Sequence, residues 1–166
     1  MNKKIIFAAI AIVLAALASC DDFNTMEEPE MKTTSTFPIN GEYWVTYTQK
    51  SSGDPVIGGR HIIMFTNTAA DQGDSLLVTD NHGGTGAYFK TAVNMENLTF
   101  GSDDAYDMAN GREMTVSNGQ FFENGTTSKT NVETDSIYLE MSFASKPDSV
   151  IVVAGYKRTG WPDDDF

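Results

Sequence analysis

Short segments of alternating apolar and polar residues recur from about residue 39 onward, and they constrain the fold of this chain more than any other feature. They are rich in Val, Ile, Thr, Tyr and Phe and lie between clusters of Gly, Asn and Asp, a pattern typical of β-strands joined by tight turns. No segment keeps an i, i+3, i+4, i+7 apolar pattern over three turns, so little helix is expected. We expect about eight strands, at 41–49, 61–68, 75–79, 87–95, 113–117, 120–123, 136–143 and 149–157, and the short segment 98–101 is a further, less clear candidate.

Three connections carry specific predictions. Asn118-Gly119 is the strongest two-residue hairpin signal in the chain, and Lys146-Pro147-Asp148 indicates a turn before the last strand. Residues 102–111 are expected to form a loop or one helical turn. Closure of an antiparallel sheet removes exposed edges. We therefore expect an all-β, eight-stranded antiparallel up-and-down β-barrel over residues 39–166, wide enough to be filled by side chains or to hold one small ligand.

The N-terminus has the pattern of a lipoprotein export signal. Lys3 and Lys4 precede an apolar run from Ile5 to Ala18, which is shorter than the about 20 residues of an ordinary membrane-spanning helix. The segment 17–20 resembles a bacterial lipobox, in which Cys20, the only Cys of the chain, is the acylated residue. Two or three acyl chains at about 0.8 kcal/mol per buried methylene would anchor the protein stably. The alternative is a buried or chance Cys after an ordinary signal peptide.

A polar, acidic segment follows the expected anchor. It contains Asp21, Asp22, Glu27, Glu28 and Glu30 and shows no periodicity, which indicates a flexible linker. An acidic stretch directly behind a lipidated Cys resembles the surface-export signal of lipoproteins from Bacteroides and its relatives, and a simple solvated tether is the alternative. We therefore expect a signal peptide at 1–19, a lipidated linker at 20–38 and a barrel at 39–166. The expected location is the outer membrane, at the cell surface or on the periplasmic face.

Composition excludes several classes of function. With 11 Lys and Arg against 23 Asp and Glu, the formal net charge is -12, which argues against nucleic acid as a partner. One Cys forms neither an internal disulfide nor a Cys-rich zinc site. Asp103, Asp104 and Asp107 with Asn110, and separately Asp71 with Asp74, offer oxygen ligands for calcium. Neither group matches the calcium-loop pattern, so we interpret them as solvated loops and expect no metal and no cofactor.

Three stretches of the chain resemble a known family. They are Gly41 to Tyr47, Phe65 to Asp71 with Gly73-Asp74, and Gly155 to Trp161 with Asp163-Asp164. Together they are similar to the Bacteroidetes lipoproteins called lipid-binding putative hydrolases, and the likeness covers roughly residues 39–166. The resemblance implies a lipocalin-like barrel. It brings no catalytic residues with it.

A weaker likeness to lipocalins concerns the closed end of the barrel. Lipocalins place an aromatic ring after a Gly on the first strand and pack an Arg from the last strand across it. Here Gly41 with Tyr43 or Trp44, and Arg158, could take these parts, and such a cation-π contact contributes about 0.5 to 2 kcal/mol. Because side chains alternate along a strand, only one of the two rings faces inward, and we expect it to be Tyr43. The alternative is that all of these are ordinary core and surface aromatics.

Hydrolysis is the less favoured activity. The chain has no Gly-x-Ser-x-Gly pentapeptide, and His61 and His82 are its only imidazole bases. His61 shares an expected strand with Ile63 and Phe65, where a partly buried structural role is expected. His82 lies in a glycine-rich loop, 81–86, which could rim a barrel mouth, so it is a weak catalytic candidate. No phosphate cradle is expected there, because no Lys-Ser/Thr pair closes the motif.

The sequence thus favours a lipid-anchored envelope protein that binds a small hydrophobic or amphipathic ligand inside a barrel. The same inward side chains would serve equally well as a dry core. Two alternatives remain: a filled barrel that acts as an accessory surface lipoprotein through exposed aromatics such as Trp161, and a weak hydrolase at the mouth. Ligand identity and oligomeric state stay open. The expected lining is Tyr43, Val45, Tyr47, Ile137, Leu139, Met141 and Phe143.

Three Asp-Ser-apolar triplets look like the O-glycosylation motif of exported Bacteroides proteins. They place the candidate serines at Ser75, Ser136 and Ser149. All three also lie where a turn gives way to an expected strand, a position where this pattern arises without modification.

Overall fold

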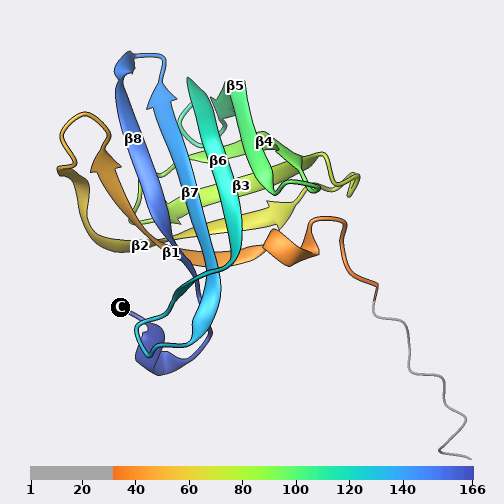
Figure 1. The fold of residues 1–166 in the computed structure, drawn as a ribbon. Coiled ribbons are helices and arrows are strands. Elements are labelled where there is room, and N and C mark those ends of the chain that lie inside the picture. The colour runs from red at the N-terminus through yellow and green to blue at the C-terminus, as the bar shows by residue number, and fades with distance from the viewer. Residues whose placement is uncertain (1–31) are drawn as a thin grey trace, which may run out of the picture. The chain divides into compact units, whose positions relative to one another are not determined.

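A computed structural model describes residues 32–166, except for the side chains of Asn81 and His82. The expected signal peptide, Cys20 and most of the linker lie outside the described residues. The described chain forms a closed barrel in which each strand pairs antiparallel with the next and β1 pairs with β8 (Figure 1). The expected all-β, eight-stranded antiparallel barrel is confirmed. Its strands are β1 Gly41–Gln49, β2 Pro55–Asn67, β3 Ser75–His82, β4 Tyr88–Asn94, β5 Thr99–Asp107, β6 Arg112–Thr127, β7 Glu133–Phe143 and β8 Lys146–Lys157.

Because neighbouring strands are antiparallel, the connections gather at two ends of the barrel. We call one the mouth: it carries the β1–β2, β3–β4, β5–β6 and β7–β8 connections. The other, the base, carries the remaining connections, the chain before β1 and the segment after β8. Two short 3-10 turns, η2 Phe37–Ile39 and η3 Pro162–Asp164, lie in these flanking segments. Within the described residues, no helix has the length and hydropathy of a membrane span.

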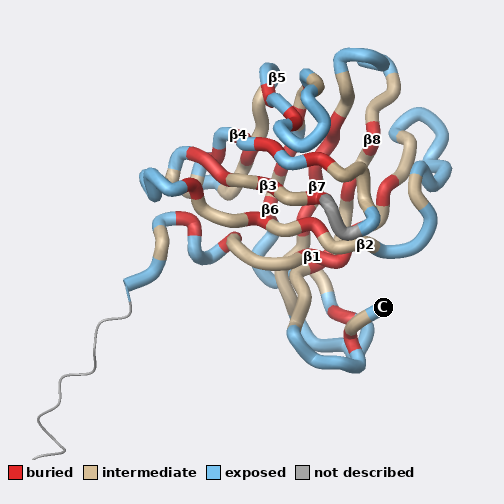
Figure 2. Tube along the Cα trace, turned by 180° about the vertical axis from the view of Figure 1, so that it is seen from behind, coloured by how far each residue is buried: buried red, intermediate tan, exposed pale blue. Residues whose placement is uncertain are grey.

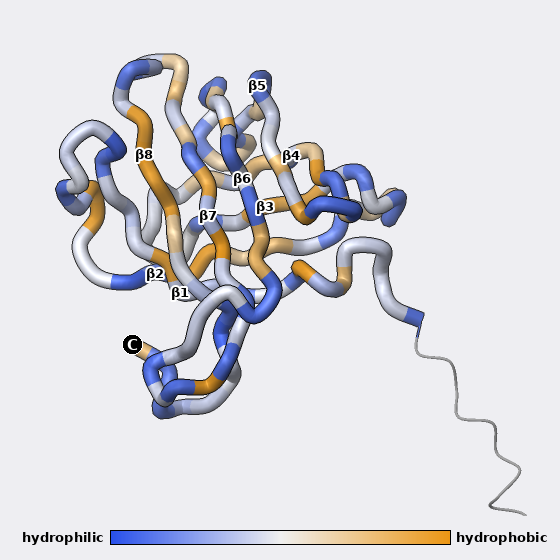
Figure 3. Tube along the Cα trace, viewed as in Figure 1, coloured by the Kyte–Doolittle hydropathy of each residue, from blue (hydrophilic) through white to orange (hydrophobic). Residues whose placement is uncertain are grey.

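Alternation along the strands builds the core. In β4 the side chains of Phe89, Thr91 and Val93 are buried, whereas their neighbours along the strand are exposed, as the period of two requires. Figures 2 and 3 show the same contrast, with buried and apolar stretches along the strands and exposed, hydrophilic connections. Apolar inward side chains from all eight strands form one hydrophobic cluster.

Aromatic rings fill the base half of this core. Phe65 packs edge-on against Tyr43 and Phe121, with ring centroids 5.5 and 5.1 Å away, and Phe100 lies 4.8 Å from Phe121. The Tyr43 hydroxyl donates to the carbonyl oxygen of Ile39 at 3.0 Å. Since Ile39 is itself buried, η2 closes the base. The compact unit begins at Thr33 and therefore includes η2.

The hairpin predicted at Asn118-Gly119 is wrong. β6 runs straight through it, and the pairing with β7 shifts register between Ser117 and Gln120. Asn118 has a φ of 52°, and a Cβ on Gly119 would lie 2.4 Å from the Phe100 carbonyl oxygen. The Asn-Gly pair therefore supplies the positive φ and the close backbone approach of a β-bulge instead of a turn.

Two further local predictions are corrected. Residues 102–107, expected as loop or helical turn, continue β5, and the turn occupies residues 108–111. The last hairpin turns at residues 144–145, because Phe143 already pairs with Lys146. Pro147 therefore lies inside β8 instead of in the predicted turn.

Candidate functional site

The seven residues expected to line the barrel all face its interior. Six of them are buried, and Phe143 is partly buried against the same core cluster. They come from β1 and β7, so the apolar surface that they form runs from base to mouth. The buried members are Tyr43, Val45, Tyr47, Ile137, Leu139 and Met141.

Trp44 and Arg158 lie on the outer side of the barrel wall. Trp44 follows the inward Tyr43, and its ring lies edge-on to Phe166 with centroids 5.6 Å apart. The Arg158 guanidinium is 5.8 Å from the Trp44 ring centroid and pairs with Glu42 at 2.7 Å and with Asp165. Hydrogen bonds to these carboxylates raise the pKa of Arg158. Arg158 therefore holds the C-terminal segment against the wall, while Tyr43 occupies the interior at the base.

At the mouth, the core meets a buried carboxyl group. Asp80, near the end of β3, is fully buried. The Tyr47 hydroxyl donates to one of its oxygens, and the backbone N–H and hydroxyl of Thr85 donate to the other at 2.8 and 2.6 Å. Burial raises the pKa of Asp80, and these hydrogen bonds oppose the rise without cancelling it. Burial, with Asp80 nearby, also raises the pKa of Tyr47.

The glycine-rich loop of residues 83–86 covers this pair. A Cβ on Gly84 would lie 1.8 Å from Asp80 Oδ1 and 2.6 Å from the Tyr47 hydroxyl, so only glycine lets the backbone come this close. Gly83 and Gly86 have φ of 89° and 72°. The loop therefore lies directly over the polar end of the core.

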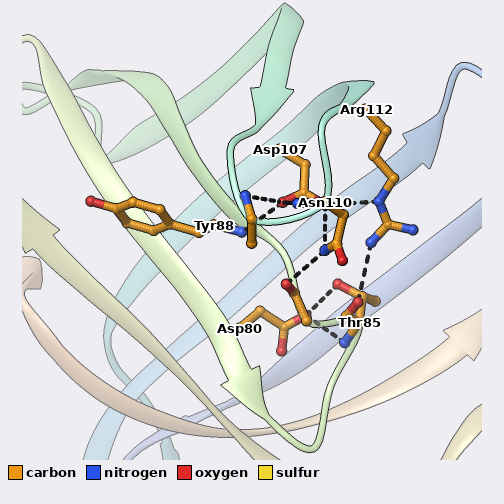
Figure 4. A network of polar contacts seen from close by, with 8 residues as sticks. Asp80, Thr85, Tyr88, Asp107, Asn110 and Arg112 are labelled. Carbon is orange, nitrogen blue, oxygen red and sulfur yellow. Dashed lines mark hydrogen bonds and ion pairs between the residues drawn. The ribbon is translucent and has the colours of Figure 1, made fainter.

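A second buried carboxylate, Asp107, ties the mouth connections together (Figure 4). It accepts hydrogen bonds from Arg112 Nε at 2.7 Å, Asn110 Nδ2 at 2.9 Å and the backbone N–H of Tyr88 at 3.0 Å. Burial raises the pKa of Asp107, but these donors outweigh it and hold the pKa below its usual value. Asp107 therefore stays ionised beside Arg112.

Arg112 joins the two carboxyl groups into one cluster. Its Nη2 donates to the Thr85 carbonyl oxygen at 3.1 Å, and its guanidinium stacks 3.9 Å from the Phe143 ring centroid. Asn110 adds a bond to the Gly86 carbonyl oxygen at 2.9 Å. We call Tyr47, Asp80, Thr85, Asp107 and Arg112 the mouth cluster. It places charge and hydroxyl groups at one end of an apolar interior.

The described residues provide weak support for acid–base hydrolysis. The His61 ring lies 5.9 Å from the Tyr47 ring, and its Nε2 is 2.8 Å from the Gly58 carbonyl oxygen. The His82 side chain lies outside the described part of the structure. Among the described residues, no three His, Cys, Asp or Glu side chains gather where they could hold a metal ion.

The candidate glycosylation sites differ in accessibility. Ser75 is buried, and its hydroxyl donates to Asp74 at 2.8 Å. Ser136 and Ser149 are partly exposed. In the folded protein these two are therefore the more accessible of the three.

Sequence reasoning missed most of the mouth cluster. Asp107 is expected from the sequence to lie in a solvated acidic loop, but it is buried and paired with Arg112. Asp80 directly precedes the glycine-rich loop, and Tyr47 was expected as apolar lining. The positions of Asp80 and Asp107 in their strands could have indicated the cluster. Each lies at an inward-facing position of a strand whose other inward-facing residues are apolar.

Comparison with known proteins gives one family. The model of the family described as "Lipid-binding putative hydrolase" matches residues 28–162. A comparison with curated proteins found no match. A crystal structure from Bacteroides ovatus at 2.40 Å resolution, described as structural genomics, unknown function, is 13% identical with a TM-score of 0.48. The likeness covers 78% of this chain and 44% of that one, so this chain spans less than half of its length. The family match covers most of the sequence, and the chain therefore belongs to the lipid-binding putative hydrolase family.

Proposed function

We propose that this is a lipid-anchored cell-envelope protein whose barrel binds one small amphipathic molecule. The observation that carries the proposal is the meeting of a continuous apolar interior with the charged mouth cluster at one end of the same barrel. Small-molecule sites usually combine apolar lining with a few placed polar groups. Membership of a lipid-binding family supports the same conclusion. The apolar part of the ligand would lie along β1 and β7.

Arg112 is the group that would receive the polar end. Its Nε and Nη2 already donate to Asp107 and Thr85, whereas its Nη1 has no hydrogen-bond partner among the described residues. The side chain is 38% exposed, and its stacking on Phe143 places it beside the expected lining. A guanidinium binds carboxylate and phosphate groups well. An anionic head group on an apolar chain is therefore the preferred ligand chemistry.

Ligand entry requires the loop of residues 83–86 to move. The loop lies over Tyr47 and Asp80, and the interior side chains beneath it are buried. Its attachments are the hydrogen bonds from Thr85 to the Asp80 carboxyl group, from the Gly86 N–H to the Asp80 carbonyl oxygen, from Arg112 to the Thr85 carbonyl oxygen and from Asn110 to the Gly86 carbonyl oxygen. Each contributes about 0.5–3 kcal/mol, most where a charged group takes part. Water can replace these bonds when the loop opens. In this proposal the structure is thus the closed form of the barrel. An entering ligand chain must separate interior side chains that contact one another.

Binding can be tested on residues 33–166, the compact unit, by displacement of a fluorescent fatty acid with dodecanoate. Wild-type protein should bind the probe, and Arg112→Lys, which keeps the charge but not the planar fork, should weaken binding about tenfold. Arg60→Lys is the matched control, because Arg60 also stacks on aromatic rings, Tyr156 and Phe166, but on the outer side. Absence of probe binding, or equal loss in both variants, would refute the proposal and favour a filled barrel with an accessory role.

The anchor can be tested separately from the ligand. Cys20→Ala should move the full-length protein from the membrane fraction to the soluble fraction of the envelope, because the acyl chains would be lost. Protease treatment of intact cells then distinguishes a surface location from a periplasmic one. A membrane-bound Cys20→Ala variant would contradict lipid anchoring.

Hydrolysis is the second candidate, and it is supported by the family description and by the position of His82 at the mouth end of β3, where it ends the strand instead of lying in the expected loop. Ester turnover by purified protein that disappears in His82→Ala would favour it. Turnover unchanged in that variant would dismiss His82 as the catalytic group.

A further inference from the structure

The barrel wall contains an opening between β4 and β5. Their ladder holds three residue pairs, from Asn94 with Thr99 to Ala92 with Gly101, and ends there. Toward the mouth, Lys90 has no ladder partner on β5. On its other side β5 changes register against β6 twice, between Phe100 and Ala105, so β5 bends where it leaves β4.

Hydrogen bonds fix both ends of this opening. At the base side, the backbone N–H of Ala92 donates to Ser102 Oγ at 3.2 Å. At the mouth side, Met108 N–H donates to the Tyr88 carbonyl oxygen at 2.7 Å, and Tyr88 N–H donates to Asp107 at 3.0 Å. The opening is therefore part of the folded wall and not a frayed strand edge.

We call this opening the wall slit. It has a volume of about 460 Å³, within the range of small-molecule sites. Thr91 and Ala105, both buried, contribute to it, so it reaches into the wall. Tyr106 and Met108 are 53% and 47% exposed. The remaining lining residues are Asp74, Ser75, Lys90, Ala92, Ser102 and Asp104.

The slit lining combines charged, hydroxyl and aromatic side chains within one small site. Among the described residues, the Lys90 ammonium and the Asp104 carboxylate make no ion pair or side-chain hydrogen bond, so both can bind a ligand. Together with Ser102 and the backbone of Lys90, they supply donors and acceptors. Tyr106 offers a flat apolar ring face beside them. One cation against two carboxylates disfavours an anion, and an alkyl chain in the slit would bury the charged Lys90 and Asp104 side chains without a partner.

We propose that the wall slit binds a small neutral polyhydroxylated molecule of the size of one or two sugar rings. Its hydroxyl groups bond Lys90, Asp104 and Ser102, and its C–H face lies on Tyr106. This site is separate from the barrel interior and does not depend on the amphipathic ligand proposed above.

The test is an NMR titration of isotope-labelled residues 33–166 with N-acetylglucosamine and with maltose at millimolar concentrations. At least one sugar should shift the amide signals of Lys90, Ala92 and Ser102 in a saturable way. Tyr106→Ala and Asp104→Asn should each raise the dissociation constant about tenfold. Two variants serve as matched controls that should leave it unchanged: Phe122→Ala, because Phe122 is an exposed aromatic residue outside the slit lining, and Asp103→Asn, because Asp103 is the exposed neighbour of Asp104.

Three results would overturn the proposal. The first is the absence of saturable shifts with both sugars. The second is equal weakening by Asp103→Asn and Asp104→Asn. The third is a stronger effect of dodecanoate than of either sugar at the slit amides. Because Arg112→Lys lies outside the slit lining, it should leave sugar binding unchanged, so failure of the interior-ligand proposal and failure of this one are distinguishable.

Discussion

Replacement of Asp107 by Asn tests how much the mouth cluster stabilises the barrel. Asp107 is fully buried and accepts from Arg112 Nε, Asn110 Nδ2 and Tyr88 N–H, with longer bonds from the backbone of residues 109 and 110. Asn keeps one acceptor oxygen and turns an NH₂ group toward donors. Removing one partner of a buried ion pair costs about 3–5 kcal/mol. Since Arg112 is 38% exposed, water can solvate it, and we expect about 3 kcal/mol.

Urea unfolding of residues 33–166 measures this loss. With an m-value of about 1–3 kcal/mol per molar urea, the midpoint should fall by roughly 1–3 M. Asp103→Asn is the control, because an exposed carboxylate should change stability by less than about 0.5 kcal/mol. Folding lowers the pKa of Asp107. Its contribution to stability is therefore present above the unfolded pKa of about 3.9 and is lost as pH falls through the folded pKa. A loss below about 1 kcal/mol at pH 7, or a difference between wild type and Asp107→Asn that persists in acid, would refute the reasoning.

Three further substitutions and one control follow from the same geometry. Burial raises the pKa of Asp80, so its contribution to folding stability is present below the unfolded pKa of about 3.9 and is lost as pH rises through the folded pKa. Asp80→Asn should therefore lower the free energy of unfolding less than Asp107→Asn does at pH 7. Urea unfolding at pH 4 and 7 measures both losses. Gly84→Ala places a Cβ 1.8 Å from Asp80 Oδ1 and should lower stability by about 1–3 kcal/mol, seen as a lower melting temperature. Gly155→Ala places a Cβ 1.9 Å from a backbone oxygen of β1 and should destabilise more, whereas Gly58→Ala meets nothing within 4 Å and should change stability by less than about 0.5 kcal/mol. Equal melting temperatures for the last two variants would contradict the close approach of β8 to β1.

The barrel could be predicted because inward-facing apolar residues recur at every second position in the strands that build the core. Tyr43, Val45 and Tyr47 in β1, and Ile137, Leu139 and Met141 in β7, are apolar or aromatic at every second position and face the interior. A slip of one residue would turn each set outward. The sequence therefore predicts which side chains of these strands face inward, and the number of such strands predicts that the sheet closes into a barrel.

Strand ends and bulges could not be predicted from the same pattern. β2 begins at Pro55, in a stretch where Gly58 and Gly59 interrupt the alternation, and β6 continues to Thr127 through exposed polar residues that leave no alternation to detect. Asn118-Gly119 suits a hairpin turn and a β-bulge equally well, because both require positive φ. Long-range pairing of β6 with β5 and β7 decides between them.

The mouth cluster was hidden for a different reason. Asp80 and Asp107 occupy inward positions that a hydrophobic pattern assigns to apolar residues, and burial of a carboxyl group is unfavourable unless partners are supplied. Their partners are distant in sequence: Tyr47 for Asp80, and the Tyr88 backbone for Asp107. One sequence shows neither pairing. Buried polar groups that break the hydrophobic pattern mark the part of the barrel where we propose that the polar end of the ligand binds.

Asp107 connects the two proposed sites, and this connection determines how variants must be interpreted. Its carboxylate accepts from Tyr88 N–H, where it closes the mouth end of the wall slit, and from Arg112, which would bind the head group of the interior ligand. Asp107→Asn should therefore impair both sites together with stability. Arg112→Lys and Asp104→Asn each touch one site, because Asp104 lines the slit and makes no contact with the mouth cluster's ion pair. Variants of this kind can assign a loss of binding to one site, whereas a loss seen with Asp107→Asn alone would reflect the shared wall.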